Sequence, residues 1–323
     1  MIINLPTSGA LNTTAVKLYF RAWHGIVGML HDFDQSYEGP VSNWVEPVDD
    51  LFAEERSDYL EGAQEDLHAT LSIIQQSNEL ALKARIAAVS PYLLLLNNEI
   101  VFSAVGKDTE FASLRTLDAV DLPRAVNTLT DSPVSATYVQ RYSELRVQRN
   151  QYTHLGDTSV VLDPIKMASA MVDQYLELWP DRPWMRDRVE STHGREGFFD
   201  GKHWSPRQEI LFLLDYDFAL IPAAGFKKLF SVKKAAVKFG CHQCQDDWAV
   251  RRSGPGLAEA PTAFYDGKKK AMHCLICDAD FAAVAKLCSA DECDGKFAAD
   301  EEAEFGAGQT HHARAAQSQQ PNG

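Results

Sequence analysis

Apolar residues recur every three or four positions through most of the first 180 residues, which is the spacing of one helical face. The first such stretch opens at Asn12-Thr13, two residue types that cap helices, and continues to about Phe33. A second stretch covers residues 51–76 and a third covers residues 78–94. Amphipathic helices bury their apolar faces against one another, so the pattern predicts an antiparallel helical bundle.

The next two helices have clearer limits. Residues 132–152 show the same periodicity, and Gly156 follows as a helix stop because glycine readily adopts the left-handed conformation. Asp163-Pro164 then reads as an N-cap followed by proline in the first helical position, which opens a helix through Leu178. The sequence therefore predicts a mainly α fold that begins with a helical bundle.

The chain is expected to divide into four parts. Residues 1–180 form the bundle, and residues 181–240 form a connecting region of small α/β character with a basic segment. Residues 241–296 form a zinc-ribbon-like module. Residues 297–323, rich in Ala, Glu and Gln, form a disordered tail because they have too few apolar residues for a core.

One apolar stretch in the connecting region is ambiguous. Residues 209–220 fit either a buried strand or a short helix, and periodicity does not decide between them. In a strand, Asp215 and Asp217 would share one face, as metal-binding carboxylates sometimes do. No third ligand accompanies them, so they are interpreted as ordinary polar positions.

The net charge of −14 argues against a simple nucleic-acid-binding protein, for which a basic surface is expected. The charge is uneven, however. Residues 1–180 carry 24 acidic and 12 basic side chains, whereas residues 181–240 carry 8 and 11. A run of lysines there could meet a phosphate backbone or simply lie on a solvated helix face: Lys227, Lys228, Lys233, Lys234 and Lys238.

The most informative residue in the predicted bundle is Arg149, which stands where the helical pattern calls for an apolar side chain. The stripe that contains it steps by four, three, four and three: Tyr138, Tyr142, Leu145, Arg149 and Tyr152. A guanidinium on that face must be paired or must line a polar cleft. His154 follows five residues later. An arginine and an imidazole at a helix end suit phosphate chemistry, although a surface pair or a helix cap is the commoner role.

Glu79 and Lys83 lie four residues apart on the third predicted helix. Glu79 could orient Arg149 across the bundle. A surface ion pair between Glu79 and Lys83 is the more common outcome of this spacing.

Arg149-Asn150 followed by His154 resembles the R-x4-6-H motif of the HEPN superfamily, whose members often carry a polar residue after the arginine. As a pattern of helices, the resemblance covers residues 10–180. It implies a homodimer whose motifs face a shared cleft and, for many members, a metal-independent endoribonuclease of toxin or antiviral defence systems. Other members are non-catalytic. One subgroup, which pairs with a nucleotidyltransferase antitoxin, has tyrosine two residues after the histidine, where this chain has Gly156.

The leading hypothesis is therefore a HEPN-like endoribonuclease that acts on RNA through the ribose 2′-hydroxyl. His154 would transfer protons, Arg149 would stabilise charge on the phosphate, and Asn150 would orient them. The expected partners are the RNA substrate, a second copy of the chain, and an antitoxin or defence-system protein. The alternative is a non-catalytic adaptor, which the acidic net charge favours.

Four cysteines have the spacing of a metal site. Cys241-x2-Cys244 and Cys274-x2-Cys277 can present four thiolates to one structural Zn²⁺ in a zinc-ribbon-like module. The aromatic residues between them fit strands, with Asp266-Gly267 as a turn: Trp248, Phe264 and Tyr265. Four cysteines close the coordination sphere, so a catalytic zinc is disfavoured.

Two histidines and two further cysteines lie near these cysteine pairs, or knuckles, in the sequence. His242 and His273 adjoin the predicted ligands and are interpreted as bystanders. Cys288 and Cys293 could complete a second site, but free thiols are favoured because no further knuckle follows.

No apolar stretch is long enough to span a bilayer, and the N-terminus has no signal-peptide pattern. We expect a cytoplasmic protein that does not enter a membrane, in which thiols stay reduced.

Overall fold

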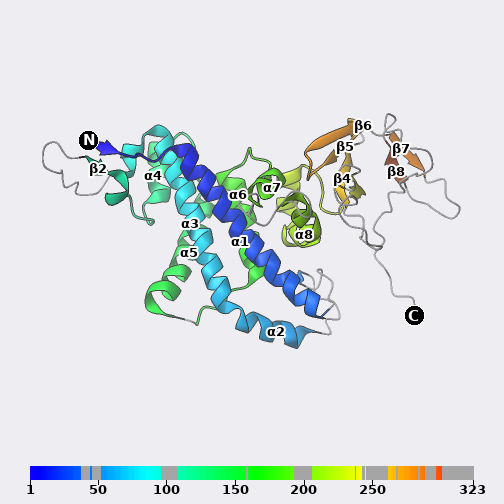
Figure 1. Ribbon diagram of the computed structural model, residues 1–323, viewed down its shortest axis with the longest axis horizontal. Coiled ribbons are helices and arrows are strands. Elements are labelled where there is room, and N and C mark those ends of the chain that lie inside the picture. Colours follow the sequence, from blue (N-terminus) through cyan, green and yellow to red (C-terminus); the bar gives the residue numbers. More distant parts are fainter. Residues whose placement is uncertain are drawn as a thin grey trace. The chain divides into compact units, whose positions relative to one another are not determined.

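The computed structural model of the chain is mainly helical, with a small antiparallel sheet (Figure 1). It describes residues 1–37, 44–45, 52–95, 108–157, 159–192, 206–236, 238–241, 244, 261–266, 268–282, 284–287 and 296–299. These residues belong to two compact units. Unit 1 comprises Met1–Arg182 and Ala219–Pro222, and unit 2 comprises Pro183–Phe218 and Ala223–Gly323.

Unit 1 is built on two long helices, α1 (Ser8–Tyr37) and α3 (Gln64–Val89), which pack side by side and antiparallel (Figure 1). The Ser77 hydroxyl of α3 donates a hydrogen bond to the Ala15 carbonyl of α1, at 2.7 Å. Ten residues further along α1, Gly25 lies against Thr70, seven residues earlier in α3. The apolar stripe of α1 predicted from the sequence forms the core: Val16, Tyr19, Phe20, Trp23, Ile26, Val27 and Leu30.

The first helix begins earlier than predicted. The backbone N–H of Ala10 donates to the Thr7 hydroxyl, so Thr7 caps a helix that starts at Ser8. Asn12 lies inside the helix instead of capping it, and its amide oxygen accepts a hydrogen bond from Trp179 Nε1 at 2.7 Å.

The expected break between the second and third helices at residues 76–78 is wrong. Helix α2 comprises Ala53–Gly62, and α3 runs without interruption from Gln64 to Val89, through the predicted break. The reason is that the polar side chains at this point have partners on other helices. Ser77 and Asn78 are buried, and the Asn78 amide accepts a hydrogen bond from the Tyr138 hydroxyl at 3.0 Å. Because these polar groups have partners inside the protein, they do not need to end the helix.

The remaining elements of unit 1 are short, except for two helices. Helix α4 (Leu122–Leu129) precedes α5 (Ala136–Leu155) and α6 (Pro164–Leu178). Single 3₁₀ turns occur at Pro91–Leu95 and Phe111–Ser113, and β1 (Ile2–Ile3) pairs in parallel with β2 (Thr109–Glu110).

The limits of α5 and α6 follow from their caps. Asp163 accepts hydrogen bonds from the backbone of Ile165 and Lys166, which confirms the predicted start of α6. Gly156 has φ 64° and ends α5, as expected. Helix α5 begins at Ala136 instead of residue 132 because the Ser135 hydroxyl caps it.

Unit 2 contains three helices in its described part: α7 (Trp184–Thr192), α8 (Pro206–Leu220) and α9 (Ala223–Phe230). The ambiguous stretch 209–220 is thus a helix. Asp215 and Asp217 therefore do not share a strand face: Asp215 is exposed, whereas Asp217 is fully buried. Asp217 lies 3.4 Å from Nε of Arg188, which is also buried, so its role in the fold is to form a buried ion pair.

The sheet of unit 2 has the strand order β3-β4-β5-β6, and every neighbouring pair is antiparallel. Its strands are β3 (Lys238–Gly240), β4 (Pro261–Asp266), β5 (Ala271–Cys274) and β6 (Ala279–Ala282). A separate hairpin joins β7 (Val284–Leu287) to β8 (Lys296–Ala299).

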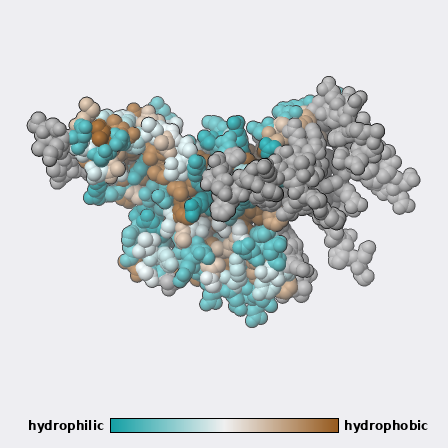
Figure 2. Space-filling model, in the orientation of Figure 1, coloured by the Kyte–Doolittle hydropathy of each residue, from teal (hydrophilic) through white to brown (hydrophobic). Residues whose placement is uncertain are grey.

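Among the helices described, none is both long enough and apolar enough to cross a bilayer. The visible surface over α2 and the end of α5 is mainly hydrophilic (Figure 2).

Candidate metal centre and the Arg149–His154 helix end

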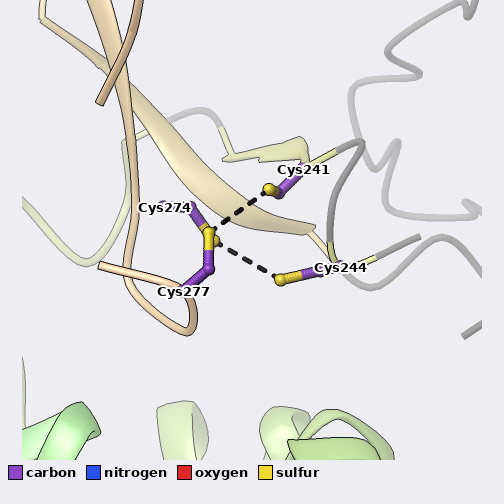
Figure 3. Close-up of side chains that lie close together, drawn as sticks. All are labelled: Cys241, Cys244, Cys274 and Cys277. Atoms are coloured by element: carbon purple, nitrogen blue, oxygen red, sulfur yellow. Dashed lines mark hydrogen bonds between the residues drawn. The ribbon is translucent and has the colours of Figure 1, made fainter. Parts of the chain in front are cut away.

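The four knuckle cysteines converge at one end of the sheet (Figure 3). Cys241 follows β3 directly, Cys274 is the last residue of β5, and Cys277 lies in the turn that leads to β6. Cys241 Sγ lies 3.7 Å from Cys277 Sγ, and Cys244 Sγ lies 3.6 Å from Cys274 Sγ. All four sulfurs lie within 4.8 Å of one another, an arrangement compatible with a metal site.

These distances suit a tetrahedral ion of the size of zinc. With Zn–S bonds of about 2.3 Å, neighbouring sulfurs in a tetrahedron are about 3.8 Å apart. The two measured edges, 3.6 and 3.7 Å, are close to that value. Cys241, Cys244 and Cys274 are buried and Cys277 is half-buried. Four thiols are thus held together in a site that is largely shielded from solvent, and thiolates are good ligands for a soft cation.

The cluster favours ionisation of at least part of its thiols. Hydrogen bonds with Cys241, Cys244 and Cys277 lower the pKa of Cys274. Hydrogen bonds with Cys241 and Cys274 raise the pKa values of Cys244 and Cys277. Cys274 Sγ also lies 3.3 Å from the buried Thr262 hydroxyl, which can donate to a thiolate.

His273 is not a fifth member of this cluster. Its Nδ1 lies 3.0 Å from Asp280, and its Nε2 lies 3.6 Å from Asp278, so both ring nitrogens face carboxylates. The predicted bystander His242, like Cys288 and Cys293, lies outside the described residues.

The second candidate site is the end of α5. The predicted inward stripe is buried at Tyr138, Tyr142 and Leu145, and it becomes half-buried at Arg149 and Tyr152. The helix therefore emerges from the core at the residues that carry the motif.

Asn150 is hydrogen-bonded to Arg149 and lies on the same face of the helix as His154. Nη1 of Arg149 donates a hydrogen bond to Asn150 Oδ1 at 2.9 Å. Asn150 and His154 are four residues apart, so they lie on one face of the helix. His154 is exposed. No carboxylate in the described part of the chain forms an ion pair with Arg149.

Buried and half-buried polar groups of α3 lie beside this helix. Burial and then the Glu79 carboxylate raise the pKa of Tyr142, whereas Arg146, Gln75 and Arg149 lower it. These groups therefore lie close enough to the Tyr142 hydroxyl to act on it, and that hydroxyl donates to the Ala119 carbonyl at 2.8 Å. The guanidinium groups of Arg146 and Arg149 and the carboxylate of Glu79 thus lie near the buried phenol of Tyr142.

The predicted surface pair between Glu79 and Lys83 does not form. Lys83 Nζ donates to the Thr116 hydroxyl at 3.1 Å, and Glu79 accepts a long hydrogen bond from Gln75 at 3.5 Å. Glu79 is instead half-buried on the side of α3 that faces Tyr142.

His68 belongs to the same region, and the sequence reasoning missed it. Its ring is buried and stacks on Tyr152, and its Nε2 donates to the Val160 carbonyl at 3.1 Å. One turn earlier, Gln64 bonds both the N–H and the carbonyl of Leu162. A signal was present, because polar residues recur on this face of α3 at steps of four, seven and four: Gln64, His68, Gln75 and Glu79.

No protein-family model matches this chain, and no match was found among curated proteins or solved structures. The fold and the cysteine cluster define it as a mainly helical protein with a four-cysteine group compatible with a metal site.

Proposed function

We propose that this chain is a metal-independent endoribonuclease of the HEPN type, with an antiparallel helical bundle over residues 1–180 and a structural zinc site in its C-terminal module. The observation that carries the proposal is the half-buried Arg149, which has no carboxylate partner among the described residues and is hydrogen-bonded to Asn150 beside the exposed His154. A guanidinium at the edge of a protein core that forms no ion pair is suited to a phosphate.

The proposed chemistry needs only the groups of this helix end and of RNA itself. The ribose 2′-hydroxyl loses its proton to a base and attacks the adjacent phosphorus. A bond forms between O2′ and phosphorus, and the bond from phosphorus to O5′ breaks. The leaving O5′ takes up a proton. The products are a 2′,3′-cyclic phosphate and a 5′-hydroxyl, with no change in oxidation state.

The residues have separate parts in this reaction. His154 moves the proton, since imidazole is the side chain whose ordinary pKa is nearest to neutral. Arg149 stabilises the negative charge that accumulates on the phosphate oxygens in the transition state. Asn150 holds the guanidinium in place.

A second imidazole would let one group act as base and the other as acid, which supports a homodimer with two facing motifs. Apolar side chains exposed near the end of α5 are consistent with such a contact: Val147, Leu155 and Val161. The zinc site would be structural, because four thiolates leave no position for water or substrate.

The alternative function is a non-catalytic adaptor, in which the helical domain dimerises and the cysteine module docks on a partner. The net charge of −14 favours this alternative because RNA is a polyanion.

An assay for cleavage of labelled single-stranded RNA by the purified full-length chain distinguishes the endoribonuclease from the adaptor. We expect cutting without added magnesium and in EDTA, with 2′,3′-cyclic phosphate ends, and no cutting of DNA of the same sequence. His154→Ala and Arg149→Ala should each lower the rate by about 100- to 10,000-fold. The matched controls are Thr153→Ala, exposed on the same helix, and Arg124→Ala, exposed on α4.

Cutting that needs magnesium, or that survives both active-site substitutions, would leave the adaptor as the better account. Light scattering provides a second readout. A chain that is monomeric at micromolar concentration would contradict the shared cleft.

A further inference from the structure

A pocket of about 130 Å³ lies in unit 2, beside the turn that carries Cys277. Three segments line it: the start of α7, the end of α9, and the end of β5 with the turn that follows. For comparison, an engineered protein cavity of roughly 150 Å³ binds benzene. The pocket therefore has the size of one small group, such as a side chain, and is too small for a nucleotide.

The buried residues of the lining are apolar. Trp184 and Met185 of α7 are buried, as is Leu275 in the turn after β5. The Trp184 ring lies 6.2 Å from the ring of Phe230, the last residue of α9, with the two planes at 86°. An aliphatic chain would bury apolar surface against these residues, and aromatic rings also attract a cation.

The Asp278 carboxylate lines the same pocket and accepts no hydrogen bond from a described residue. The neighbouring imidazole of His273 uses its Nδ1–H to donate to Asp280 at 3.0 Å. Its Nε2 is 3.6 Å from Asp278, which is longer than a hydrogen bond. The Asp278 carboxylate is thus open to a donor that enters the pocket.

Arg186 also lines the pocket, but Glu190 balances its charge. Arg186 Nε lies 2.9 Å from the Glu190 carboxylate, and this hydrogen bond is the main reason that the pKa of Arg186 is raised. Asp278 and Asp280 remain, and His273, which lies between them, can neutralise at most one of the two. The pocket therefore has an excess of negative charge, which favours a cation and disfavours a phosphate.

We propose that this pocket binds a lysine side chain from a basic segment of a partner protein. The aliphatic stem would lie against Trp184 and Phe230, and the ammonium group would donate to Asp278. The lysine side chain is slightly smaller than benzene, whereas that of arginine is larger and has more donors to satisfy. A basic partner also suits a chain with a net charge of −14, because opposite charges speed the encounter. The inference goes beyond the proposed cleavage, since it involves neither RNA nor the end of α5.

The test titrates the full-length chain, labelled with carbon-13 at its methionine methyl groups, with a blocked peptide of alanines around one lysine. The Met185 methyl signal, assigned through Met185→Leu, reports on the pocket because Met185 lines it. Matched peptides replace the lysine with arginine or with norleucine, which keeps an aliphatic stem without the charge.

Three variants accompany the titration. Asp278→Asn removes the carboxylate charge and suits the φ of 53° at this position, because asparagine tolerates the left-handed conformation. Arg186→Gln removes the cation from the lining. The matched control is Asp215→Asn, which removes an exposed carboxylate of α8 that does not line the pocket.

We expect the lysine peptide to shift the Met185 signal with a Kd of about 1 mM and the norleucine peptide to bind at least about fivefold more weakly. Asp278→Asn should weaken lysine binding by about fivefold, as expected for a partly exposed ion pair. Arg186→Gln should strengthen it by roughly twofold, and Asp215→Asn should leave it unchanged.

Equal binding of the lysine and norleucine peptides, or a Met185 signal that does not move, would overturn the proposal. So would a loss in Asp278→Asn no larger than that in Asp215→Asn. Tighter binding of the arginine peptide would assign the pocket to a different side chain. Tighter binding of free 1,5-diaminopentane would assign it to a small amine instead of a protein, and either result would also overturn the proposal.

Discussion

The ring of His68 stacks face to face on the ring of Tyr152, with centroids 4.0 Å apart and planes 2° apart. His68 belongs to α3, and Tyr152 lies in the last turn of α5, two residues before His154. The stack, together with the bond from His68 to Val160, fixes both the end of the motif helix and the segment that follows it. A residue far from the motif in sequence thus positions the proposed catalytic helix.

His68→Ala should destabilise unit 1 by about 2–4 kcal/mol, since it opens a cavity and removes the partner of the half-buried Val160 carbonyl. His68→Phe keeps the stacked ring and loses only the hydrogen bond, so its cost should be nearer 1 kcal/mol. Urea denaturation followed by circular dichroism gives both values. If the two variants are equally stable, the stack contributes nothing measurable.

The buried hydrogen bond from the Tyr138 hydroxyl to Asn78 should contribute to stability in the same assay. Tyr138→Phe leaves the Asn78 amide oxygen buried without that donor, at a cost of about 1–3 kcal/mol. Tyr92→Phe is the matched control, because Tyr92 is half exposed. A loss as small as that of the control would mean that water replaces the missing donor.

Alkaline pH should destabilise the helical domain through Tyr138. Burial, followed by the neighbouring Tyr142, raises the pKa of Tyr138 well above its usual value of 10. The fold therefore favours the neutral phenol. The stability from this difference is fully present below the unfolded-state pKa of about 10 and is lost as the pH rises toward the folded-state pKa.

The measurement is the free energy of unfolding between pH 8 and pH 11, with tyrosine ionisation followed by absorbance. Stability should fall above pH 10, and the fall should be smaller in Tyr138→Phe. An identical pH dependence in the two proteins would show that other groups govern alkaline unfolding.

If the four cysteines hold the proposed zinc ion, its removal should unfold the C-terminal module and leave the helical domain folded. Purified protein should contain about one zinc ion per chain, and Cys244→Ser should abolish it, because binding at such sites is coupled to folding. Elemental analysis and limited proteolysis measure the two effects. Full zinc content in Cys244→Ser would show that the ion is held elsewhere.

The ion pair between Arg188 and Asp217 predicts a non-additive pair of substitutions. The two side chains are 1% and 0% exposed, so Arg188→Met should cost about 3–5 kcal/mol by removing the cation that lies 3.4 Å from a fully buried carboxylate. Arg188→Met combined with Asp217→Leu should recover most of that loss. If the double variant is no more stable than the single one, the pair is needed for more than charge compensation.

Features that depend on a few neighbouring residues could be predicted from the sequence. Asp163 and Pro164 set the start of α6, and Gly156 set the end of α5, because caps and left-handed glycines depend on a few neighbouring residues. The paired spacing of Cys241 and Cys244 likewise predicted a cluster, since each knuckle places two thiols close together.

Other features depended on residues distant in sequence. The sequence analysis placed a break at residues 76–78, yet hydrogen bonds from Ser77 to α1 and between Asn78 and α5 let the helix continue there. His68 could not be paired with Tyr152, nor Arg188 with Asp217, before the fold brought them together.

The sequence by itself determined the mainly helical character, two helix limits and the cysteine cluster, because periodicity, caps and ligand spacing operate over a few residues. Only the tertiary structure decided which polar groups are buried and which partners they meet, such as Tyr152 for His68 and Asp217 for Arg188. The physical reason is that the cost of burying a polar or charged group depends on its partner, and the partner comes from another part of the chain.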